Sequence, residues 1–205
     1  MWESGEMTSL AFVSVAALSY LLGSVPFGLI ITRLGGAGDV RAIGSGNIGA
    51  TNVLRTGRKE LALATLVLDA GKGAAAVLLA RHLFDNEALT AVAGASAFMG
   101  HLFPVWLNFK GGKGVATFYG VLLAAAWPAG LVAAGLWIAL FALTRISSLS
   151  ALIAAAAGLA AAWLTQQPAP ILLLTAFMTI LIYVRHHENI GRLVRGQEPR
   201  FGAGR

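Results

Sequence analysis

The chain alternates between long apolar runs with few or no charges and polar stretches that hold most of its charges. The apolar runs cover residues 7–32, 61–81, 88–109, 114–144 and 146–184. An apolar run of roughly 20 residues is long enough to cross a bilayer as one helix. The pattern therefore predicts membrane-crossing helices joined by polar connections.

Two of these runs are too long for one simple span. Residues 146–184 are predicted to form two helices, because the run is broken at Gln166-Gln167-Pro168. Residues 114–144 leave two alternatives. A single helix would be roughly 46 Å long in a hydrocarbon core of about 30 Å, and Pro128 would kink it. Two short helices would instead turn back near Pro128.

The positions of lysine and arginine favour the turn near Pro128. If residues 114–144 fold back, thirteen basic residues lie on one side of the membrane, as cytoplasmic basic residues usually do. We therefore predict an all-α polytopic integral membrane protein with about seven transmembrane helices, some short, an outside N-terminus and a cytoplasmic C-terminus. The thirteen residues are Arg33, Arg41, Arg55, Arg58, Lys59, Lys110, Lys113, Arg145, Arg185, Arg192, Arg195, Arg200 and Arg205.

Composition supports this class. Of the 205 residues, 57% are hydrophobic and only 12% are charged, with a mean hydropathy of +0.75. A chain this short cannot bury so much apolar surface in one water-soluble core, which disfavours a soluble enzyme. The absence of cysteine excludes disulfides and thiolate metal sites. We expect a single transmembrane domain over residues 1–205.

The first polar motif, residues 44–55, has the sequence GSGNIGATNVLR. Its glycines match G-x-G-x-x-G, but no strand precedes them and no βαβ unit follows, so the dinucleotide-binding interpretation is rejected. Glycine still lets backbone N–H groups approach an anion closely, and Arg55 offers a bidentate fork for phosphate. The alternative is a membrane re-entry loop rich in turn residues. Neutral hydrogen-bonding groups come from Ser45, Asn47, Thr51 and Asn52.

Two further polar motifs lie next to apolar runs. The second, residues 108–114, has the sequence NFKGGKG, in which lysines among glycines can hold an anion against exposed amides. Its alternative is a pair of lysines that snorkel to anionic lipid. The third, residues 185–192, has the sequence RHHENIGR, where His186 or His187 is a candidate for phosphate binding or proton transfer. Its alternative is a solvated interfacial face, and adjacent histidines on a helix chelate a metal poorly.

Polar residues also occur inside the apolar runs. Asp69 and Lys72 are spaced i, i+3 within one predicted span. Intramembrane charges are usually functional, but these two also suit a mutual ion pair near a helix end. His101 lies at the inner end of its span, as either a site residue or a buried structural histidine.

The motifs together resemble a known family. The segments GSGNIGATNVLR (44–55), DAGKG (69–73), GHLFPVWLNFKGGKGVAT (100–117) and RHHENIGRL (185–193) are similar to those of the bacterial acyl-phosphate-dependent glycerol-3-phosphate acyltransferases, the PlsY family. The resemblance covers nearly the whole chain in the same order and spacing.

The resemblance implies an enzyme of the bacterial plasma (inner) membrane, with its active site facing the cytoplasm. Such an enzyme transfers a fatty acyl group from acyl phosphate to the sn-1 hydroxyl of glycerol 3-phosphate. The products, 1-acyl-glycerol 3-phosphate (lysophosphatidic acid) and phosphate, begin phospholipid synthesis. We expect the two substrates and membrane lipid as binding partners. We expect no cofactor, metal, nucleic acid or obligate protein partner.

The resemblance implies Ser45, Arg55, Lys110, Lys113, His186 and Asn189 as site residues, and the motifs themselves add the rest. The expected residues fall into three groups. The expected catalytic residues are Ser45, His186 and Asn189. The expected substrate-binding residues are Gly46, Asn47, Gly49, Thr51, Asn52, Arg55, Lys110, Gly112 and Lys113. Residues with an expected supporting role are Asp69, Lys72, His101 and Glu188.

The residues agree with transfer that forms no acyl-enzyme. The sequence has no Gly-x-Ser-x-Gly elbow and no cysteine nucleophile. We therefore expect direct attack of the acceptor hydroxyl on the acyl carbonyl, with a substrate phosphate or His186 as the base. A membrane transporter of organic phosphates is the alternative function, and it predicts inverted repeats and a binding site at mid-membrane.

Overall fold

Ten α-helices and three short 3₁₀ turns make up residues 2–202, the part that this computed structural model describes, with side chains given from Thr8 onward. Arg205, one of the thirteen basic residues of the topology prediction, lies outside the described residues. The helices are α1 (Trp2–Gly23), α2 (Phe27–Leu34), α3 (Ala50–Val53), α4 (Lys59–Phe84), α5 (Glu87–Leu102), α6 (Val115–Ala125), α7 (Trp127–Thr144), α8 (Ser147–Leu164), α9 (Ala169–Arg185) and α10 (His187–Val194). The 3₁₀ turns are η1 (Val40–Ala42), η2 (Leu54–Thr56) and η3 (Val105–Leu107).

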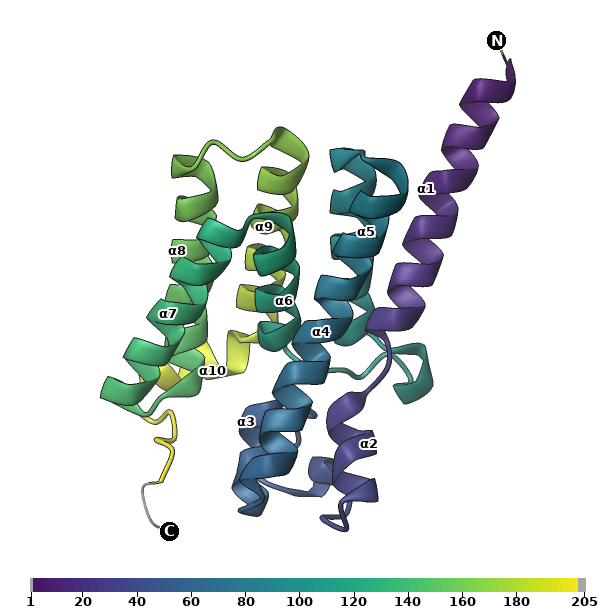
Figure 1. Ribbon diagram of the computed structural model, residues 1–205. Coiled ribbons are helices and arrows are strands. Elements are labelled where there is room, and N and C mark those ends of the chain that lie inside the picture. The colour runs from purple at the N-terminus through teal and green to yellow at the C-terminus, as the bar shows by residue number, and fades with distance from the viewer. Residues whose placement is uncertain (1, 203–205) are drawn as a thin grey trace.

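The long helices run roughly side by side, with α1 leaning outward at one edge and α7 and α8 at the other (Figure 1). The start of α1 and the C-terminal tail lie at opposite ends of the bundle (Figure 1). The end that carries the tail also carries α2, α3 and α10, and we call it the tail end. The termini are therefore arranged as the topology prediction requires.

The predicted membrane helices are present, and not all of them are full spans. Within residues 2–202, five segments are long and apolar enough to cross a membrane, and α9 with α10 forms a sixth as a pair bent by 62°. With α6, these give the seven apolar crossings of the prediction. However, α6 has 11 residues, about 16 Å of helix, so it covers only half of a hydrocarbon core.

The first predicted span, residues 7–32, is present as one apolar segment, Thr8–Leu34, but its helix is broken. Helix α1 ends at Gly23, and α2 begins at Phe27 after Pro26. Proline has no N–H and disfavours helix in the preceding residue, so the backbone at this point loses helical hydrogen bonds. Lys72 replaces one of them by donating from Nζ to the carbonyl oxygen of Val25 at 2.8 Å.

The predicted span 88–109 is also shorter as a helix. Helix α5 ends at Leu102, because Pro104 follows and holds residue 103 out of the helical conformation. The chain then makes the η3 turn before it reaches the second motif. The residues just before the lysines are therefore loop and not membrane helix.

The turn near Pro128 is confirmed. Helix α6 ends at Ala125 and α7 begins at Trp127, with Pro128 in its first turn, where proline is tolerated. Arg81 of α4 donates to the carbonyl oxygens of Ala124 and Ala125 at 2.9 and 3.1 Å. These carbonyls end a helix and lack helical partners, so Arg81 makes it possible for α6 to stop inside the bundle.

Small residues bring the helices close together. A Cβ on Gly23 would lie 2.0 Å from the carbonyl oxygen of Ala97, and one on Gly120 would lie 1.9 Å from that of Ala70. Close backbone approach of this kind is how helices pack when lipid, not water, surrounds them. The largest buried cluster includes Phe98, Phe118, Leu122 and Met178, and it lies among α4, α5, α6, α7, α8 and α9.

Candidate active site

The first motif folds around the side chain of Asn52, which is buried. The two N–H groups of its Nδ2 are shared among the carbonyl oxygens of Val40, Ile43 and Asn47, at 2.8–2.9 Å. Its Oδ1 accepts hydrogen bonds from the backbone N–H of Ser45 at 3.1 Å and from Arg55 Nη1 at 3.1 Å. Asn52, expected to bind substrate, thus has its amide occupied by the loop itself and holds the loop in shape.

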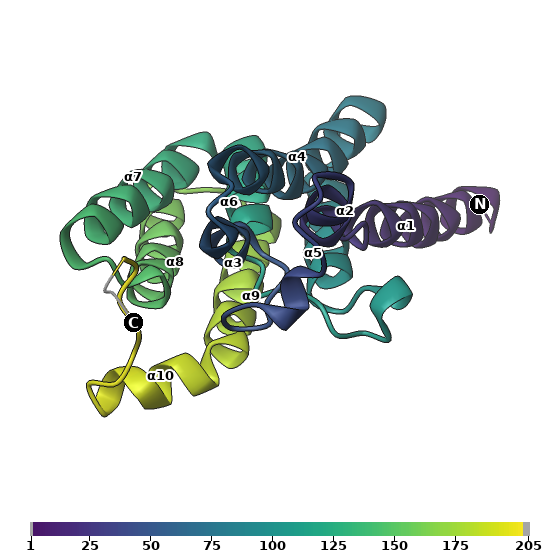
Figure 2. The ribbon, with the colours of Figure 1, turned by 90° about the horizontal axis from the view of Figure 1, so that it is seen from below.

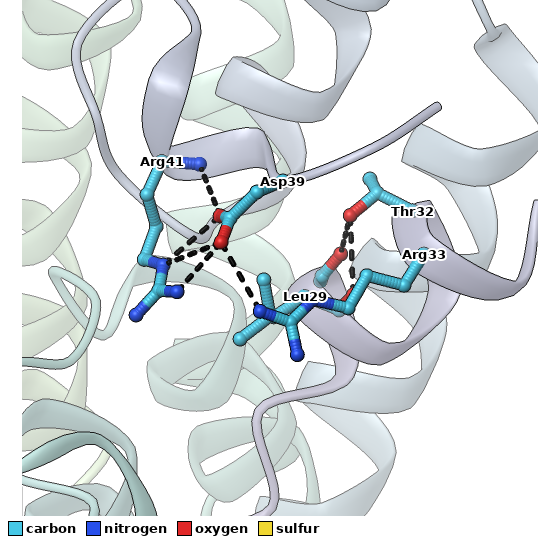
Figure 3. A network of polar contacts seen from close by, with 6 residues as sticks. Leu29, Thr32, Arg33, Asp39 and Arg41 are labelled. Carbon is cyan, nitrogen blue, oxygen red and sulfur yellow. Dashed lines mark hydrogen bonds and ion pairs between the residues drawn. The ribbon is translucent and has the colours of Figure 1, made fainter. Parts of the chain in front are cut away.

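An ion-pair network orders the chain just before this motif (Figure 3). Asp39 accepts from the backbone N–H of Arg41 at 3.0 Å and from its guanidinium at 2.6 Å, and Arg33 approaches at 3.2 Å. Hydrogen bonds from Arg41, with Arg33 adding to them, hold the pKa of the Asp39 carboxyl well below its usual range. Asp39 caps the start of the η1 turn, and the carbonyl oxygen of Val40 in this turn accepts a hydrogen bond from Asn52.

The glycines of the first motif are required by its conformation. Gly44 and Gly46 have φ of +55° and +69°, in the left-handed region that glycine adopts without strain. A Cβ on Gly44 would lie 2.6 Å from Asn52 Oδ1. Gly49 donates its N–H to Asn47 Oδ1 at 2.9 Å just before α3 begins. Helix α3 has only four residues, so its dipole is small.

Ser45 and Arg55 lie on the exposed side of this loop. The Ser45 hydroxyl is 3.4 Å from Asn52 Oδ1, which also accepts from Arg55. Among the side chains of residues 8–202, no ion pair involves Arg55, whereas Arg41 and Arg58 are paired with acids. The first motif therefore presents one arginine whose charge no carboxylate neutralises.

The second motif places its two lysines differently. Lys110 is exposed, whereas Lys113 is half-buried and donates from Nζ to Asn189 Oδ1 of the third motif. Burial lowers the pKa of the Lys113 ammonium, and the nearby Glu198 carboxylate opposes that effect. The structure thus separates two lysines that the sequence did not distinguish.

Arg185 ties the second motif to the end of α9. Its guanidinium donates to the carbonyl oxygens of Gly111 and Gly112 at 3.1 and 3.2 Å. On the opposite side, the N–H of Gly112 donates to the carbonyl oxygen of His101 at 3.1 Å, and a Cβ on Gly112 would lie 2.2 Å from that imidazole. Gly112 is therefore a packing requirement of the loop.

The third motif contributes two buried polar residues at the bend between α9 and α10. His186 is 3% exposed, and its Nδ1 lies 2.8 Å from the carbonyl oxygen of Ile182. A carbonyl only accepts, so Nδ1 carries the proton and Nε2 keeps its lone pair. Burial lowers the pKa of His186 to about 4, so the imidazole is neutral at pH 7. Asn189 follows three residues later and is 6% exposed.

The other polar residues of the third motif lie outside this cluster. His187 is exposed, and its Nδ1 contacts the carbonyl oxygen of Val184 at 2.9 Å. Glu188, expected to support the site, has a side chain that is 73% exposed and lies 4.0 Å from Arg192. The bend thus turns one histidine inward and leaves its neighbour in solvent.

Contacts between distant segments bring the three motifs together at the tail end. Besides the bond between Lys113 and Asn189, Thr51 Oγ1 lies 3.1 Å from Ser147 Oγ at the start of α8. The next residue, Ser148, donates to Glu198 of the tail at 2.7 Å. Seen from this end, α3, α10 and the loop that follows α5 lie around the same face (Figure 2). The start of α8 therefore connects the first motif with the third.

The charged residues inside the membrane helices form a separate cluster. Lys72 Nζ lies 2.7 Å from Asp69 Oδ1, with both side chains at most 2% exposed, and His101 Nδ1 lies 3.6 Å from the same oxygen. The ion pair expected for Asp69 and Lys72 is present, but it lies in the middle of α4 and not near a helix end. Lys72 stabilises the break after α1, and His101 contacts the second motif through its backbone.

Four residues in or near the motifs were not predicted from the sequence to be part of the site: Arg185, Ser147, Ser148 and Glu198. Arg185 is the first residue of the third motif, but no site role was predicted for it. The two serines stand in an otherwise apolar run, and Glu198 is an acid among tail arginines. These departures from the local pattern were the available signals.

Comparison with known proteins assigns the family. A family model described as "Glycerol-3-phosphate acyltransferase" matches residues 13–196. The chain belongs to the glycerol-3-phosphate acyltransferase family. It is therefore an integral membrane enzyme of phospholipid synthesis, as the motifs suggested, and the transporter alternative is set aside.

Individual relatives agree along nearly the whole chain. The glycerol-3-phosphate acyltransferase of Caulobacter vibrioides (strain NA1000) is 60% identical over 201 residues, covering 96% of this chain and 92% of that protein. The one from Brucella ovis is 56% identical and covers 99% of each chain. The crystal structure of PlsY (YgiH), an integral membrane glycerol 3-phosphate acyltransferase, in its glycerol 3-phosphate form has a TM-score of 0.88 and 37% identity. It covers 93% of this chain and 96% of that one.

Proposed function

We propose that this enzyme transfers a fatty acyl group from an acyl phosphate to the sn-1 hydroxyl of glycerol 3-phosphate. The products are 1-acyl-glycerol 3-phosphate and inorganic phosphate. The reaction takes place where the three motifs meet, on the cytoplasmic side of the bacterial plasma membrane. Related crystal structures support the acceptor and product, since PlsY (YgiH) has been described in a glycerol 3-phosphate form and in a lysophosphatidic acid form.

The observation that carries this proposal is the contact between Lys113 and Asn189, which joins the second motif to the third. It places an ammonium group beside the buried, neutral His186 at the end of the bundle that also carries Ser45 and Arg55. Both proposed substrates carry phosphate, and a cationic site reduces the repulsion between them. We assign Lys113 to the reacting groups and Lys110, which is exposed, to the rim of the site.

The reaction proceeds by direct transfer. The acceptor oxygen attacks the acyl carbonyl, the carbonyl–phosphate bond breaks, and phosphate leaves with the bonding electrons. The acceptor proton goes to His186 Nε2 or to a substrate phosphate. Positioning and stabilisation of developing negative charge by Lys113 and Arg55 supply the rate enhancement. The hydroxyl groups of Ser45, Ser147 and Ser148 contact Asn52, Thr51 and Glu198, and none of them is bonded to a histidine as an activated serine nucleophile would be.

The test is acyl transfer by the full chain purified in detergent, with acyl phosphate as donor and radiolabelled glycerol 3-phosphate as acceptor. We expect labelled lysophosphatidic acid and one released phosphate per product. Acyl-CoA and acyl carrier protein thioester serve as alternative donors in parallel reactions. Product from a thioester and none from acyl phosphate would reject the proposed donor while leaving the family assignment intact. A covalent acyl-enzyme trapped without acceptor would reject direct transfer.

A further inference from the structure

The C-terminal tail returns to the site by a defined turn at the end of α10. Gly196, at φ +67°, donates its N–H to Leu193, and Gln197 donates to Arg192 at 2.8 Å. This pair of bonds is the Schellman motif, in which glycine in the left-handed conformation reverses the chain after a helix. The turn directs the residue that follows, Glu198, back toward α10.

The returning tail is fixed at its other end as well. Phe201 donates its N–H to the carbonyl oxygen of Arg145 at 2.7 Å, and its ring lies 6.0 Å from that of Phe141 of α7. Residues 195–202 therefore form a strap from the end of α10 to the connection between α7 and α8. Glu198 lies in the middle of this strap, and its side chain is 8% exposed.

The carboxylate of Glu198 receives hydrogen bonds from two helices. Its Oε1 accepts from Ser148 Oγ of α8 and from Asn189 Nδ2 of α10, and its Oε2 accepts from Arg192 Nε at 2.7 Å. A buried carboxylate is unfavourable unless such partners surround it. The first turn of α8, whose free N–H groups favour negative charge, adds to the stabilisation. The tail thus places a carboxylate with hydrogen bonds to both oxygens beside Asn189, which in turn contacts Lys113.

The carboxylate determines how Asn189 is oriented. An ionised carboxylate can only accept hydrogen bonds, and the Lys113 ammonium can only donate them. Asn189 lies between these two groups, with Nδ2 toward Glu198 and Oδ1 toward Lys113. A flipped amide would place oxygen against carboxylate and N–H against ammonium. Glu198 therefore excludes the flipped state and keeps Oδ1 available to hold Lys113.

We propose that Glu198 is a positioning residue of the acyl-transfer site, which orients Asn189 and through it the ammonium group of Lys113. This assignment rests on the proposed function. The carboxylate repels anionic substrates, so it contributes to the placement of Lys113 and not to ground-state binding. Its removal is therefore expected to lower kcat without raising the KM for glycerol 3-phosphate.

The experiment compares Glu198→Ala, Glu198→Gln and Ser148→Ala with wild type, as full chains in detergent, using the acyl-phosphate assay. We expect Glu198→Ala to lower kcat by about tenfold to a hundredfold, as misplacement of a catalytic group does, with an unchanged or lower KM for glycerol 3-phosphate. Glutamine keeps the Oε1 acceptor for both Ser148 and Asn189, although its –NH2 group cannot accept from Arg192 as Oε2 does, so Glu198→Gln should recover kcat to within about threefold of wild type. Ser148→Ala removes one bond to the same oxygen and should lower kcat by about threefold.

Two control variants separate positioning from stability. Phe201→Ala weakens the far anchor of the strap without touching Glu198, so it should lower Tm but leave kcat unchanged. Glu87→Gln removes another acid paired with an arginine, Arg81 at 3.3 Å, and should leave both kcat and KM unchanged.

Several outcomes would overturn the proposal. The first is an unchanged kcat in Glu198→Ala. The second is a higher kcat/KM in that variant, which would mean that the carboxylate blocks the site. The third is a loss of kcat in Phe201→Ala equal to that in Glu198→Ala. If Glu198→Ala does not fold, an unchanged kcat in Ser148→Ala together with a Glu198→Gln kcat far below wild type overturns it. Inactivity of the wild-type chain with acyl phosphate would instead contradict the proposed donor.

Discussion

The first motif and the cluster around Lys113 lie at the same end of the bundle, but their hydrogen bonds come from different distances along the chain. Asn52 bonds only to groups between Val40 and Arg55, at most 12 residues away. Lys113 and Asn189 are 76 residues apart, and Ser148 and Glu198 are 50 apart. One region is held by its own sequence, and the other exists only after α8, α9 and the tail have packed.

This difference separates the two regions in how they respond to substitution. A change in the first motif acts within a short loop, because its glycines and Asn52 provide their own supports. A change near Lys113 affects side chains that contact one another across four segments, namely the second motif, α8, α10 and the tail. Variants of each kind therefore test whether local or long-range contacts dominate the function of the site.

The largest effect is expected from removing the buried lysine. Lys113→Ala should lower kcat/KM by about a thousandfold, because a preorganised cation near developing negative charge is lost. Lys110→Ala, which removes an exposed charge from the same glycine-rich loop, should lower it by about threefold, as exposed charges contribute little. Steady-state kinetics give kcat/KM for both variants, and the two losses relative to wild type are compared. Equal losses would show that burial does not distinguish the two lysines.

The burial of His186 at the bend between α9 and α10 predicts a pH dependence of stability. The folded-state pKa is about 4, below the ordinary 6.5, so between these values the unfolded chain binds a proton that the folded chain does not. Stability is therefore complete above pH 6.5 and falls as pH drops toward 4, by about 3 kcal/mol in all.

The measurement for His186 is Tm between pH 7.5 and 4.5, followed by tryptophan fluorescence in detergent. His186→Gln should show a smaller loss of Tm over this range than wild type. His82→Gln, which removes an exposed histidine, should follow the wild-type curve. A His186→Gln curve parallel to wild type would contradict the burial of a neutral imidazole.

The local region is tested by Asn52→Ala. The carbonyl groups of Val40, Ile43 and Asn47 would lose their donor, and the loop would lose the shape that presents Ser45 and Arg55. We expect kcat/KM to fall by about a hundredfold. Asn86→Ala, which removes a helix cap at the opposite end of the bundle, should lower Tm slightly and leave kcat/KM unchanged. Near-normal activity of Asn52→Ala would mean that the glycines alone hold the loop.

A small effect is expected where the two regions meet. Thr51→Val and Ser147→Ala each remove the hydroxyl contact at 3.1 Å, worth about 1 kcal/mol, so each should lower kcat/KM by about fivefold. The double variant should be no worse than either single variant, because one shared contact is lost. Additive losses in this double-mutant cycle would show that the two hydroxyl groups act separately.

The fold was predictable to a large extent because its signals are local. The apolar runs, Pro128 and the Gln166–Pro168 break gave the helices and their reversals, and basic residues gave the arrangement of the termini. The break after α1 was not predicted, because residues 7–32 are uncharged and read as one span. The break is stabilised by a distant residue, Lys72, which donates to the carbonyl oxygen of Val25, and a linear pattern does not display such a contact.

The sequence by itself determined the class of membrane protein, the positions of its main helix breaks and the motifs that carry its chemistry. Hydropathy, proline and glycine act over a few residues, and a linear pattern displays them. Only the tertiary structure decided that Lys113 and not Lys110 faces Asn189, and that Ser147, Ser148 and Glu198 link the motifs. Those choices depend on which side chains meet after residues 50 to 96 positions apart have packed together.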